Sequence, residues 1–333
     1  MNNEFEQFKA IVDRSRTFVL TTHVNPDGDG LGSETALASY LRSLGKEAVI
    51  LNHSATPPNY AFLNDVYPIE QFAAHRHSKI VAEADAILVL DSNHPDRLVS
   101  LQDAVLASRA TKVCIDHHLE PSPFAELYIL DESSTATGEI VYRLVSYLNH
   151  GNLSKDIAIS LYTAIMTDTG SFKYPKTDPD VHHIIAELIE KGADPVWIYD
   201  QVYEQGTAGR LRLLGEGLSG LRTSSDGKIA YIVLSQEMFH RTGASESDTD
   251  AFVPYTLSIK NVQIGLMFTE LADCIKINFR SKGDIWVNEL AKQFGGNGHK
   301  NAAGARVATC GVANSKLDQL ISQVVDKAKT FTR

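Results

Sequence analysis

Three short apolar segments constrain the fold of this chain most. They are Thr17–Thr22, Asp85–Asp91 and Lys112–Asp116, and each has the aliphatic and β-branched composition of a buried strand. Helix-like stretches separate them, so that residues 1–190 alternate between the two kinds of element. This alternation predicts an α/β fold in which a mainly parallel sheet is flanked by helices.

Polar side chains follow each of the three segments. His23, Asp27 and Asp29 lie in a glycine-containing loop after the first, Asp91 ends the second, and Asp116–His118 ends the third. In open parallel sheets, ligands bind at the carboxyl ends of the strands. We therefore expect these side chains to meet in one crevice.

A further carboxylate, Asp168, ends a predicted helix over Ser154–Asp168. Its charge meets the negative end of the helix dipole, which is unfavourable unless a cation lies nearby. Carboxylate and imidazole groups are suitable ligands for divalent ions. The residues alone leave other interpretations open: the loop after His23 can be a simple turn in which Asp29 caps the next helix, and Asp168 can be an exposed residue opening a loop.

The pattern changes beyond residue 222. Strand-like segments at Ile229–Leu234, Val262–Phe268 and Cys274–Phe279 precede a helix near residues 313–329. We therefore predict a first domain over residues 1–190, a helical linker over 191–221, and a smaller α/β domain over 222–333.

Charge and cysteine content exclude several classes of function. The chain has 31 Lys and Arg against 41 Asp and Glu, a net charge of −10, and no basic run, which argues against a groove for a long polyanion. Cys114, Cys274 and Cys310 lack the spacing of a disulfide framework or a thiolate zinc site. No apolar segment approaches the roughly 20 residues of a membrane span, and the first residues lack the pattern of a secretory signal. We expect a cytoplasmic protein with no membrane partner.

Taken together, these motifs resemble those of the DHH phosphoesterase superfamily, named for the tripeptide found here at Asp116–His118. All four superfamily motifs occur in order across residues 23–170. The sequences NFRS at 278–281 and GGNGHKNAAG at 295–304 resemble the DHH-associated C-terminal domain. The chain is most similar to the nanoRNase and pAp-phosphatase branch. Asn297 departs from the pattern, which usually has glycine there, but asparagine tolerates positive φ and the loop is expected to survive.

The resemblance implies two divalent metal ions, usually Mn²⁺, with Asp91 bridging them. The implied metal ligands are His23, Asp27, Asp29, Asp91, His117 and Asp168. His23 and Asp27 would complete the first site, and Asp29, His117 and Asp168 the second. His118 would face the substrate phosphate, and Asp116 would orient an imidazole from behind. Asp91, Asp116, His117 and His118 form the implied catalytic group.

In the C-terminal domain, the resemblance implies that Arg280, Gly296, Gly298 and His299 bind the substrate together with His118. The implied reaction is phosphoester hydrolysis by a water held between two metal ions. The implied substrates are short single-stranded oligonucleotides, 3′-phosphoadenosine 5′-phosphate (pAp) or linear dinucleotides. An inorganic pyrophosphatase and a noncatalytic nucleotide-binding module are the alternatives, and a homodimer is one assembly that the sequence allows.

Two other features receive structural interpretations. We expect Thr135–Gly138 to serve in capping a helix over Ser133–His150, and Trp197 and Trp286 to make core or interdomain contacts.

Overall fold

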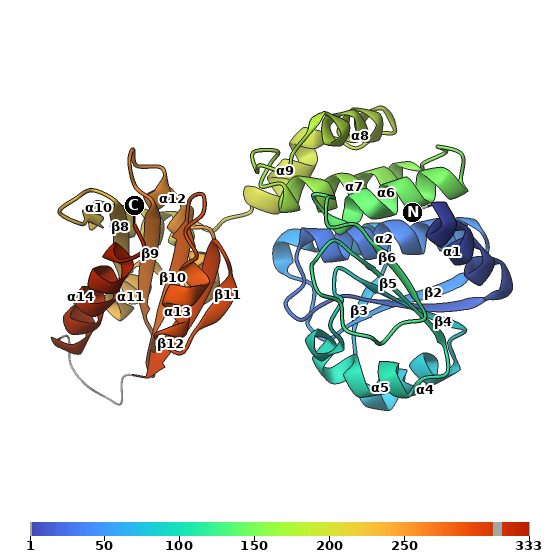
Figure 1. Cartoon of the computed structure of the whole chain (residues 1–333), viewed down its shortest axis with the longest axis horizontal. Coiled ribbons are helices and arrows are strands. Elements are labelled where there is room, and N and C mark those ends of the chain that lie inside the picture. The colour runs from blue at the N-terminus through green and yellow to red at the C-terminus, as the bar shows by residue number, and fades with distance from the viewer. Residues whose placement is uncertain (1, 309–314, 333) are drawn as a thin grey trace. The chain divides into compact units, whose positions relative to one another are not determined.

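The computed structural model describes residues 2–308 and 315–332 and divides the chain into two compact units, Met1–Gln205 and Gly206–Arg333 (Figure 1). The division falls inside the range predicted as a linker. That range is largely helical: α9 (Pro195–Tyr203) packs on the N-terminal unit and α10 (Ala208–Ser219) on the C-terminal unit. The assignment of a separate function to each unit stays a prediction.

The N-terminal unit contains a six-stranded, wholly parallel sheet with the order β3-β2-β1-β4-β5-β6. The strands are β1 (Thr17–Thr21), β2 (Glu47–Asn52), β3 (Ile69–Gln71), β4 (Ala86–Leu90), β5 (Thr111–Asp116) and β6 (Leu127–Leu130). The three strands expected from the sequence are β1, β4 and β5, and they are neighbours in the middle of the sheet. Their carboxyl ends therefore lie side by side at one edge.

Helices cover both faces of this sheet, which confirms the predicted α/β class (Figure 1). Phe18 and Leu20 pack on the side of α1 (Asn2–Arg14), α2 (Gly28–Ser43), α6 (Thr137–Leu148), α7 (Lys155–Asp168) and α8 (Pro179–Glu190). Val19 points the other way, toward α4 (Ala74–Glu83) and α5 (Gln102–Ala107). Successive residues of a strand alternate between faces, and both faces are apolar here because both are covered.

Helix α2 lies at the centre of the unit, and local sequence explains where it begins. The Asp27 side chain accepts hydrogen bonds from the main-chain N–H groups of Asp29 (3.1 Å) and Gly30 (3.3 Å). Asp27 is thus the N-cap, and the alternative in which Asp29 has this role is wrong. Gly32 allows α2 to approach α7 closely, because a Cβ atom there would lie 2.4 Å from the carbonyl oxygen of Ser160.

The C-terminal unit has a second six-stranded sheet with the order β11-β12-β10-β9-β8-β7, in which only β8 and β9 pair in parallel. Its strands are β7 (Arg222–Thr223), β8 (Ile229–Leu234), β9 (Ile264–Glu270), β10 (Cys274–Ser281), β11 (Asn297–His299) and β12 (Ala302–Ala308). Its helices, besides α10, are α11 (Gln236–Thr242), α12 (Val253–Leu257), α13 (Val287–Lys292) and α14 (Ser315–Lys329). The three predicted strands and the last helix are confirmed, whereas Cys310 lies outside the described residues.

The tryptophans are not fully buried within their own units, and the expectation of core or interdomain contacts stays a prediction. Trp197 is 39% exposed and packs edge-on against Phe62 at 5.2 Å between ring centroids. Trp286 is 53% exposed and carries the Lys300 ammonium 5.4 Å from its ring centroid. Across the described ranges, no helix combines the length and apolar character that crossing a membrane requires.

Candidate metal centre

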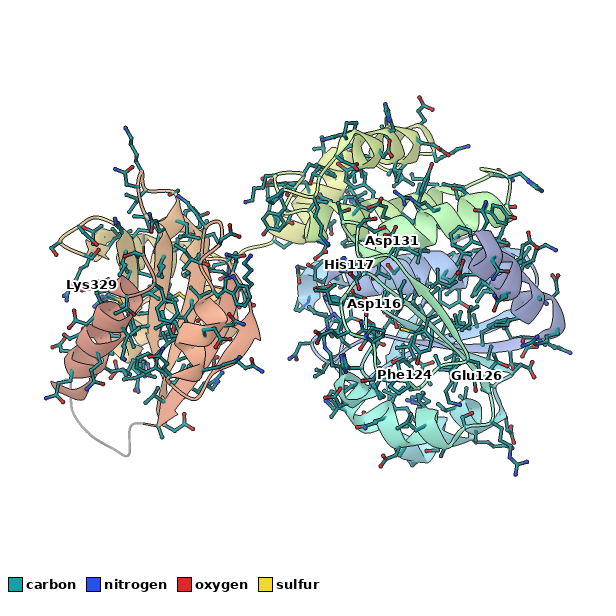
Figure 2. All side chains as sticks on the ribbon, in the orientation of Figure 1. Asp116, His117, Phe124, Glu126, Asp131 and Lys329 are labelled. Atoms are coloured by element: carbon teal, nitrogen blue, oxygen red, sulfur yellow. The ribbon has the colours of Figure 1, made fainter. Side chains whose placement is uncertain are left out.

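The six predicted metal ligands converge at the carboxyl edge of the N-terminal sheet. His117, labelled in Figure 2 beside Asp116, follows β5, and the other five ligands reach the same place from the β1 loop, α2, the end of β4 and α7. These ligand atoms form two groups, each within 4.8 Å: His23, Asp27 and Asp91 in one, and Asp29, His117 and Asp168 in the other. A third group within the same distance consists of Asp91, Asp116, His117 and His118. The first two groups are those that the resemblance implied, while the binding of metal itself stays a prediction.

Asp91 lies between the two groups. Its Oδ2 atom is 3.2 Å from Nε2 of His23, and its Oδ1 atom is 3.7 Å from Nε2 of His117. The residue follows the end of β4 with a φ of 55°, a left-handed conformation that aspartate tolerates better than most residues. This turn at the strand end presents one carboxylate to both groups, as a bridging ligand requires. Such strained backbone positions are concentrated at functional sites.

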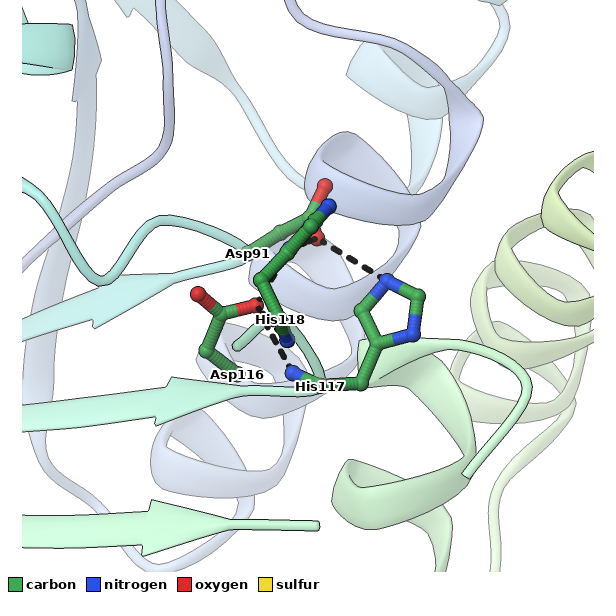
Figure 3. A group of neighbouring side chains, drawn as sticks. All are labelled: Asp91, Asp116, His117 and His118. Carbon is green, nitrogen blue, oxygen red and sulfur yellow. Dashed lines mark hydrogen bonds and ion pairs between the residues drawn. The ribbon is translucent and has the colours of Figure 1, made fainter. Parts of the chain in front are cut away.

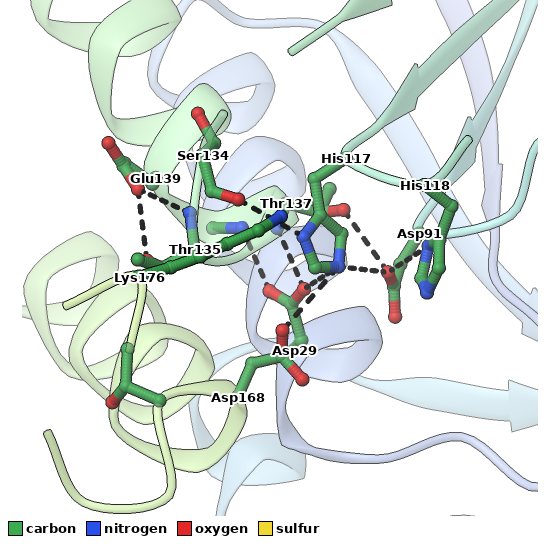
Figure 4. A network of polar contacts seen from close by, with 12 residues as sticks. Asp29, Asp91, His117, His118, Ser134, Thr135, Thr137, Glu139, Asp168 and Lys176 are labelled. Atoms are coloured by element: carbon green, nitrogen blue, oxygen red, sulfur yellow. Dashed lines mark hydrogen bonds and ion pairs between the residues drawn. The ribbon is translucent and has the colours of Figure 1, made fainter. Parts of the chain in front are cut away.

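The second group centres on His117 (Figure 4). Its Nε2 atom lies 3.5 Å from Oδ2 of Asp168 and 3.8 Å from Oδ2 of Asp29. A cavity of about 190 Å³ opens beside this group. Its lining comprises His117, Thr135, Asp168, Thr169, Tyr174, Pro175, Lys176 and Thr177. The second group is therefore accessible to a small ligand.

The carboxylate of Asp29, only 1% exposed, is oriented by the start of α6. The main-chain N–H groups of Thr137 and Gly138 donate to its two oxygens at 2.7 and 2.8 Å, and the hydroxyl of Thr137 donates to Asp91 at 3.2 Å (Figure 4). Helix α6 has no side-chain cap of its own. Thr135 does contribute locally to this helix start, because its main-chain N–H and hydroxyl donate to Glu139 at 2.8 and 2.9 Å. The local capping interpretation fails for Thr137 and Gly138, whose N–H groups donate to a carboxylate about 108 residues away.

Thr137 and Gly138 are thus site residues that sequence reasoning missed. The sequence signal that could have identified them is the run of threonine and glycine at residues 135–138, where a helix begins beside the expected crevice. Glycine is needed at position 138 because a Cβ atom there would lie 2.5 Å from Cβ of Ala164 and 3.4 Å from Oδ1 of Asp29.

Main-chain carbonyl groups fix the orientation of both ligand imidazoles. Nδ1 of His23 donates to the carbonyl oxygen of Val24 at 2.9 Å, and Nδ1 of His117 lies 3.4 Å from the carbonyl oxygen of Ser134. Each Nε2 atom is left facing the carboxylates, in the tautomer that a metal ligand needs. Burial lowers the pKa of His117, which favours the neutral, ligating form of its ring.

Asp116 has a different surrounding. This fully buried carboxylate accepts hydrogen bonds from the main-chain N–H of His117 (2.7 Å) and from both the main-chain N–H (3.2 Å) and the Nδ1 atom (2.7 Å) of His118 (Figure 3). Burial raises the pKa of Asp116, but the hydrogen bond from His118 outweighs it and the pKa is lowered. Asp116 therefore orients the half-buried His118 ring by holding its Nδ1 atom.

The pKa values of the clustered groups indicate which ligand the site would bind. Burial, followed by the charges of Asp91, Asp168 and Asp27, raises the pKa of Asp29 well above its usual value. Burial and the same kind of repulsion raise the pKa of Asp168 to about 7. Burial lowers the pKa of His23, but its hydrogen bonds to Asp27 and Asp91 outweigh burial and raise the pKa to about 10. Without a cation, the cluster therefore holds protons on its carboxyl and imidazole groups, and divalent cations would displace them. The four ligand carboxylates and two neutral imidazoles fit two divalent cations, whose four positive charges would balance them.

The predicted substrate-binding residues of the C-terminal unit lie around β10 and β11. Nη1 of Arg280 donates to the carbonyl oxygen of Phe279 at 3.0 Å. Gly296 and Gly298 make close backbone approaches, since a Cβ atom would lie 2.2 Å from the carbonyl oxygen of Gly304 and 2.5 Å from that of Ala302, respectively. Asn297 does not adopt a positive φ, so the loop does not depend on the tolerance of asparagine for that conformation. The positive φ values belong to Gly295 (73°) and Gly298 (149°). The side chain of His299 lies outside the described residues.

Comparison with known proteins agrees with this geometry. Residues 17–165 match the N-terminal domain of the DHH family, and residues 226–330 match the DHHA1 domain. A protein of Thermus thermophilus named bifunctional oligoribonuclease and PAP phosphatase NrnA is 29% identical, with 93% of this chain and 88% of that protein covered. Its namesake from Bacillus subtilis is 28% identical, with 87% and 89% covered.

A solved structure supports the same relationship. The crystal structure of an exopolyphosphatase-related protein from Bacteroides fragilis is 33% identical, covers 99% of this chain and 97% of its own, and superposes with a TM-score of 0.93. With both domains matched in order and the signature residues grouped at one sheet edge, the chain belongs to the DHH family.

Proposed function

We propose that this protein hydrolyses short oligonucleotides to mononucleotides and removes a phosphate from pAp, using two divalent metal ions. The position of Asp91 carries the proposal, because its two oxygens face the two ligand groups separately. The chain is a hydrolase of a phosphoesterase family, and relatives covering most of its length are named for these two activities.

The first ion would be held by His23, Asp27 and Asp91, and the second by Asp29, Asp91, His117 and Asp168. Mixed imidazole and carboxylate ligands suit Mn²⁺ better than Mg²⁺, and we propose Mn²⁺ for both positions. When bound, the ions would supply an activated water, orient the phosphate and neutralise charge on the leaving oxygen.

The protein's own groups would prepare and orient the reactants. Asp91 sets the spacing between the two ligand groups, and the α6 N-terminus fixes Asp29. Burial lowers the pKa of His118, but the hydrogen bond to Asp116 outweighs burial and the pKa is raised above its usual value. We propose that the protonated His118 ring donates from Nε2 to an oxygen of the substrate phosphate. The Nδ1–H of the ring would remain hydrogen-bonded to the carboxylate of Asp116.

The preference for short substrates follows from charge. A net charge of −10 and the lack of a basic run disfavour binding along a long strand, where affinity grows with the number of phosphate contacts. We propose that Arg280 and the turn at Gly296 and Gly298 hold a second part of the substrate. The buried free thiols of Cys114 and Cys274 are consistent with work in the reducing cytoplasm, and a homodimer stays a prediction.

A substrate panel tests the function. Protein stripped with EDTA and reloaded with Mn²⁺ is incubated with oligonucleotides of graded length from two to about twenty nucleotides, and with pAp, pyrophosphate and polyphosphate. We expect the fastest release of mononucleotide from the shortest oligomers and release of phosphate from pAp. Dominant hydrolysis of pyrophosphate or polyphosphate would replace this function with another, and metal-independent binding without turnover would leave a nucleotide-binding module.

A further inference from the structure

Arg97 lies on η2 (Pro95–Leu101), which follows Asp91 in the chain, and hydrogen bonds of Arg97 and of the preceding Asn93 hold this part of the chain against two loops of the site. The N–H of Val24, next to His23, donates to the carbonyl oxygen of Arg97 at 2.8 Å. The side chain of Asn93 donates to the carbonyl oxygens of His118 (3.0 Å) and Leu119 (3.1 Å). The main chain of Arg97 is therefore held against the loop that carries His23, and Asn93, which precedes η2, is held against the loop that carries His118.

The guanidinium of Arg97 has no partner among residues 2–308 and 315–332: it forms no hydrogen bond, ion pair or ring contact with them. The residue is half-buried. A partly buried arginine ordinarily pairs with a carboxylate or another acceptor. This arginine does not, so its five donors remain available to an anion.

The charge of Arg97 reaches His118. The charged group of Arg97 interacts electrostatically with the imidazole of His118. The two groups are therefore within electrostatic reach of each other. Two neighbouring donors of this kind are brought together favourably by an anion between them.

The backbone beside Arg97 is strained. Val99 has a φ of 46° and interrupts the helical conformation of η2. A β-branched residue rarely adopts positive φ, and such strain persists where the surroundings impose it, often at functional sites. The kink lies two residues after the one that is anchored to Val24.

We propose that Arg97 binds a phosphate group of the substrate together with His118. The planar guanidinium presents parallel N–H donors that match two oxygens of one phosphate, a match that lysine cannot reproduce. The ligand class is a phosphate monoester or diester, as in a nucleotide or a short oligonucleotide. This inference rests on the proposed function, and it assigns to the N-terminal unit a cationic group of its own for the substrate.

Arg97→Gln and Arg97→Lys test the assignment, and Arg109→Gln is the matched control. Arg109 is exposed, precedes β5 and therefore lies at the opposite edge of the sheet from the site. Titration calorimetry measures the binding of Mn²⁺ alone, and then of inorganic phosphate and pAp to the Mn²⁺-loaded protein. Turnover of a dinucleotide gives kcat/KM.

We expect Arg97→Gln to weaken phosphate binding and lower kcat/KM by about 10- to 100-fold, the effect of losing a charge-assisted bidentate contact. Arg97→Lys should lie between this variant and the unchanged chain. Mn²⁺ affinity and the melting temperature should stay the same in both, and Arg109→Gln should match the unchanged chain throughout.

Phosphate binding by Arg97→Gln as tight as that of the unchanged chain would overturn the proposal. A loss of Mn²⁺ affinity or a drop in melting temperature in both Arg97 variants would also overturn it, because the side chain would then support the loop. If Arg97 proves necessary for phosphate binding but the unchanged chain hydrolyses no phosphoester, the proposed function fails and the assignment of Arg97 stands.

Discussion

Replacing Asp91 by asparagine should remove the response of this protein to both metal ions, because Asp91 alone among the ligands faces both groups with different oxygens. The Asp91→Asn substitution keeps the size of the side chain but removes the charge and one of the two oxygens. Asp168→Asn, in contrast, changes a ligand of the second group only. Asp65→Asn, on the surface of α3 (Leu63–Val66), is the control.

The magnitude follows from linkage. Each ion present at a hundredfold excess over its dissociation constant stabilises the folded state by about 2.7 kcal/mol, so two ions contribute about 5 kcal/mol. For a unit of this size, each kcal/mol raises the melting temperature by about 2 to 4 °C, so Mn²⁺ should raise it by roughly 10 to 20 °C. Asp168→Asn should keep about half of this shift, and Asp91→Asn little of it.

The assay is thermal unfolding of EDTA-treated protein titrated with Mn²⁺, followed by turnover of a dinucleotide at saturating metal. Even an outer partner of a metal ligand is worth about 10- to 100-fold in activity, so Asp91→Asn should lose at least that factor. Asp65→Asn should match the unchanged chain in both measurements. A full Mn²⁺ shift and unchanged turnover in Asp91→Asn would refute the bridging role.

Three other predictions concern parts of the site and the fold. Thr137→Val keeps the shape of the side chain but removes the hydroxyl donor to Asp91, and we expect a loss of about 1.5 to 3 kcal/mol in Mn²⁺ binding by calorimetry; unchanged affinity would show that the contact is dispensable. The pKa of Asp168 is raised to about 7, so its contribution to stability is favourable at low pH and is lost as the pH rises through 7. The melting temperature of the EDTA-treated protein should therefore fall from pH 5 to 8, while the affinity for Mn²⁺ rises. A melting temperature and an Mn²⁺ affinity that change in the same direction would contradict this sign. Gly32→Ala should lower the free energy of unfolding in urea by about 1 to 3 kcal/mol, because the new Cβ atom would meet Ser160. Gly215→Ala on α10, where no atom lies within 4 Å of the new Cβ, should raise it by about 0.5 to 1 kcal/mol. Equal effects of the two substitutions would refute the packing argument.

Much of the site could be predicted from sequence because its ligands come directly after strands with clear patterns. The end of a buried strand is visible in β1, β4 and β5, and parallel pairing then places Asp91 and Asp116 at one edge. The order of strands in the sheet was not needed for this prediction. That β1, β4 and β5 are also neighbours is a property of the strand order, which only the structure shows.

The interactions that orient the ligands could not be predicted in this way. Asp29 has the same sequence context as a helix cap, yet Asp27 caps α2 and Asp29 accepts the N–H donors of α6. The choice depends on which donors come within reach after the chain has folded. One contact across the unit satisfies both the Asp29 carboxylate in the first turn of α2 and the main-chain N–H groups at the start of α6.

The sequence by itself determined the α/β class, the order of the motifs and the residue types available as ligands, because strand and helix periodicities are local properties. The resemblance implied that Asp91 bridges the two ligand groups. Tertiary structure alone decided which Asp91 oxygen faces each group, that Thr137 and Gly138 belong to the site, and that the Arg97 guanidinium is left unpaired among the described residues. These features depend on distances of a few ångströms between segments far apart in the chain. Packing of α2, α6 and the sheet sets those distances, and no local pattern contains them.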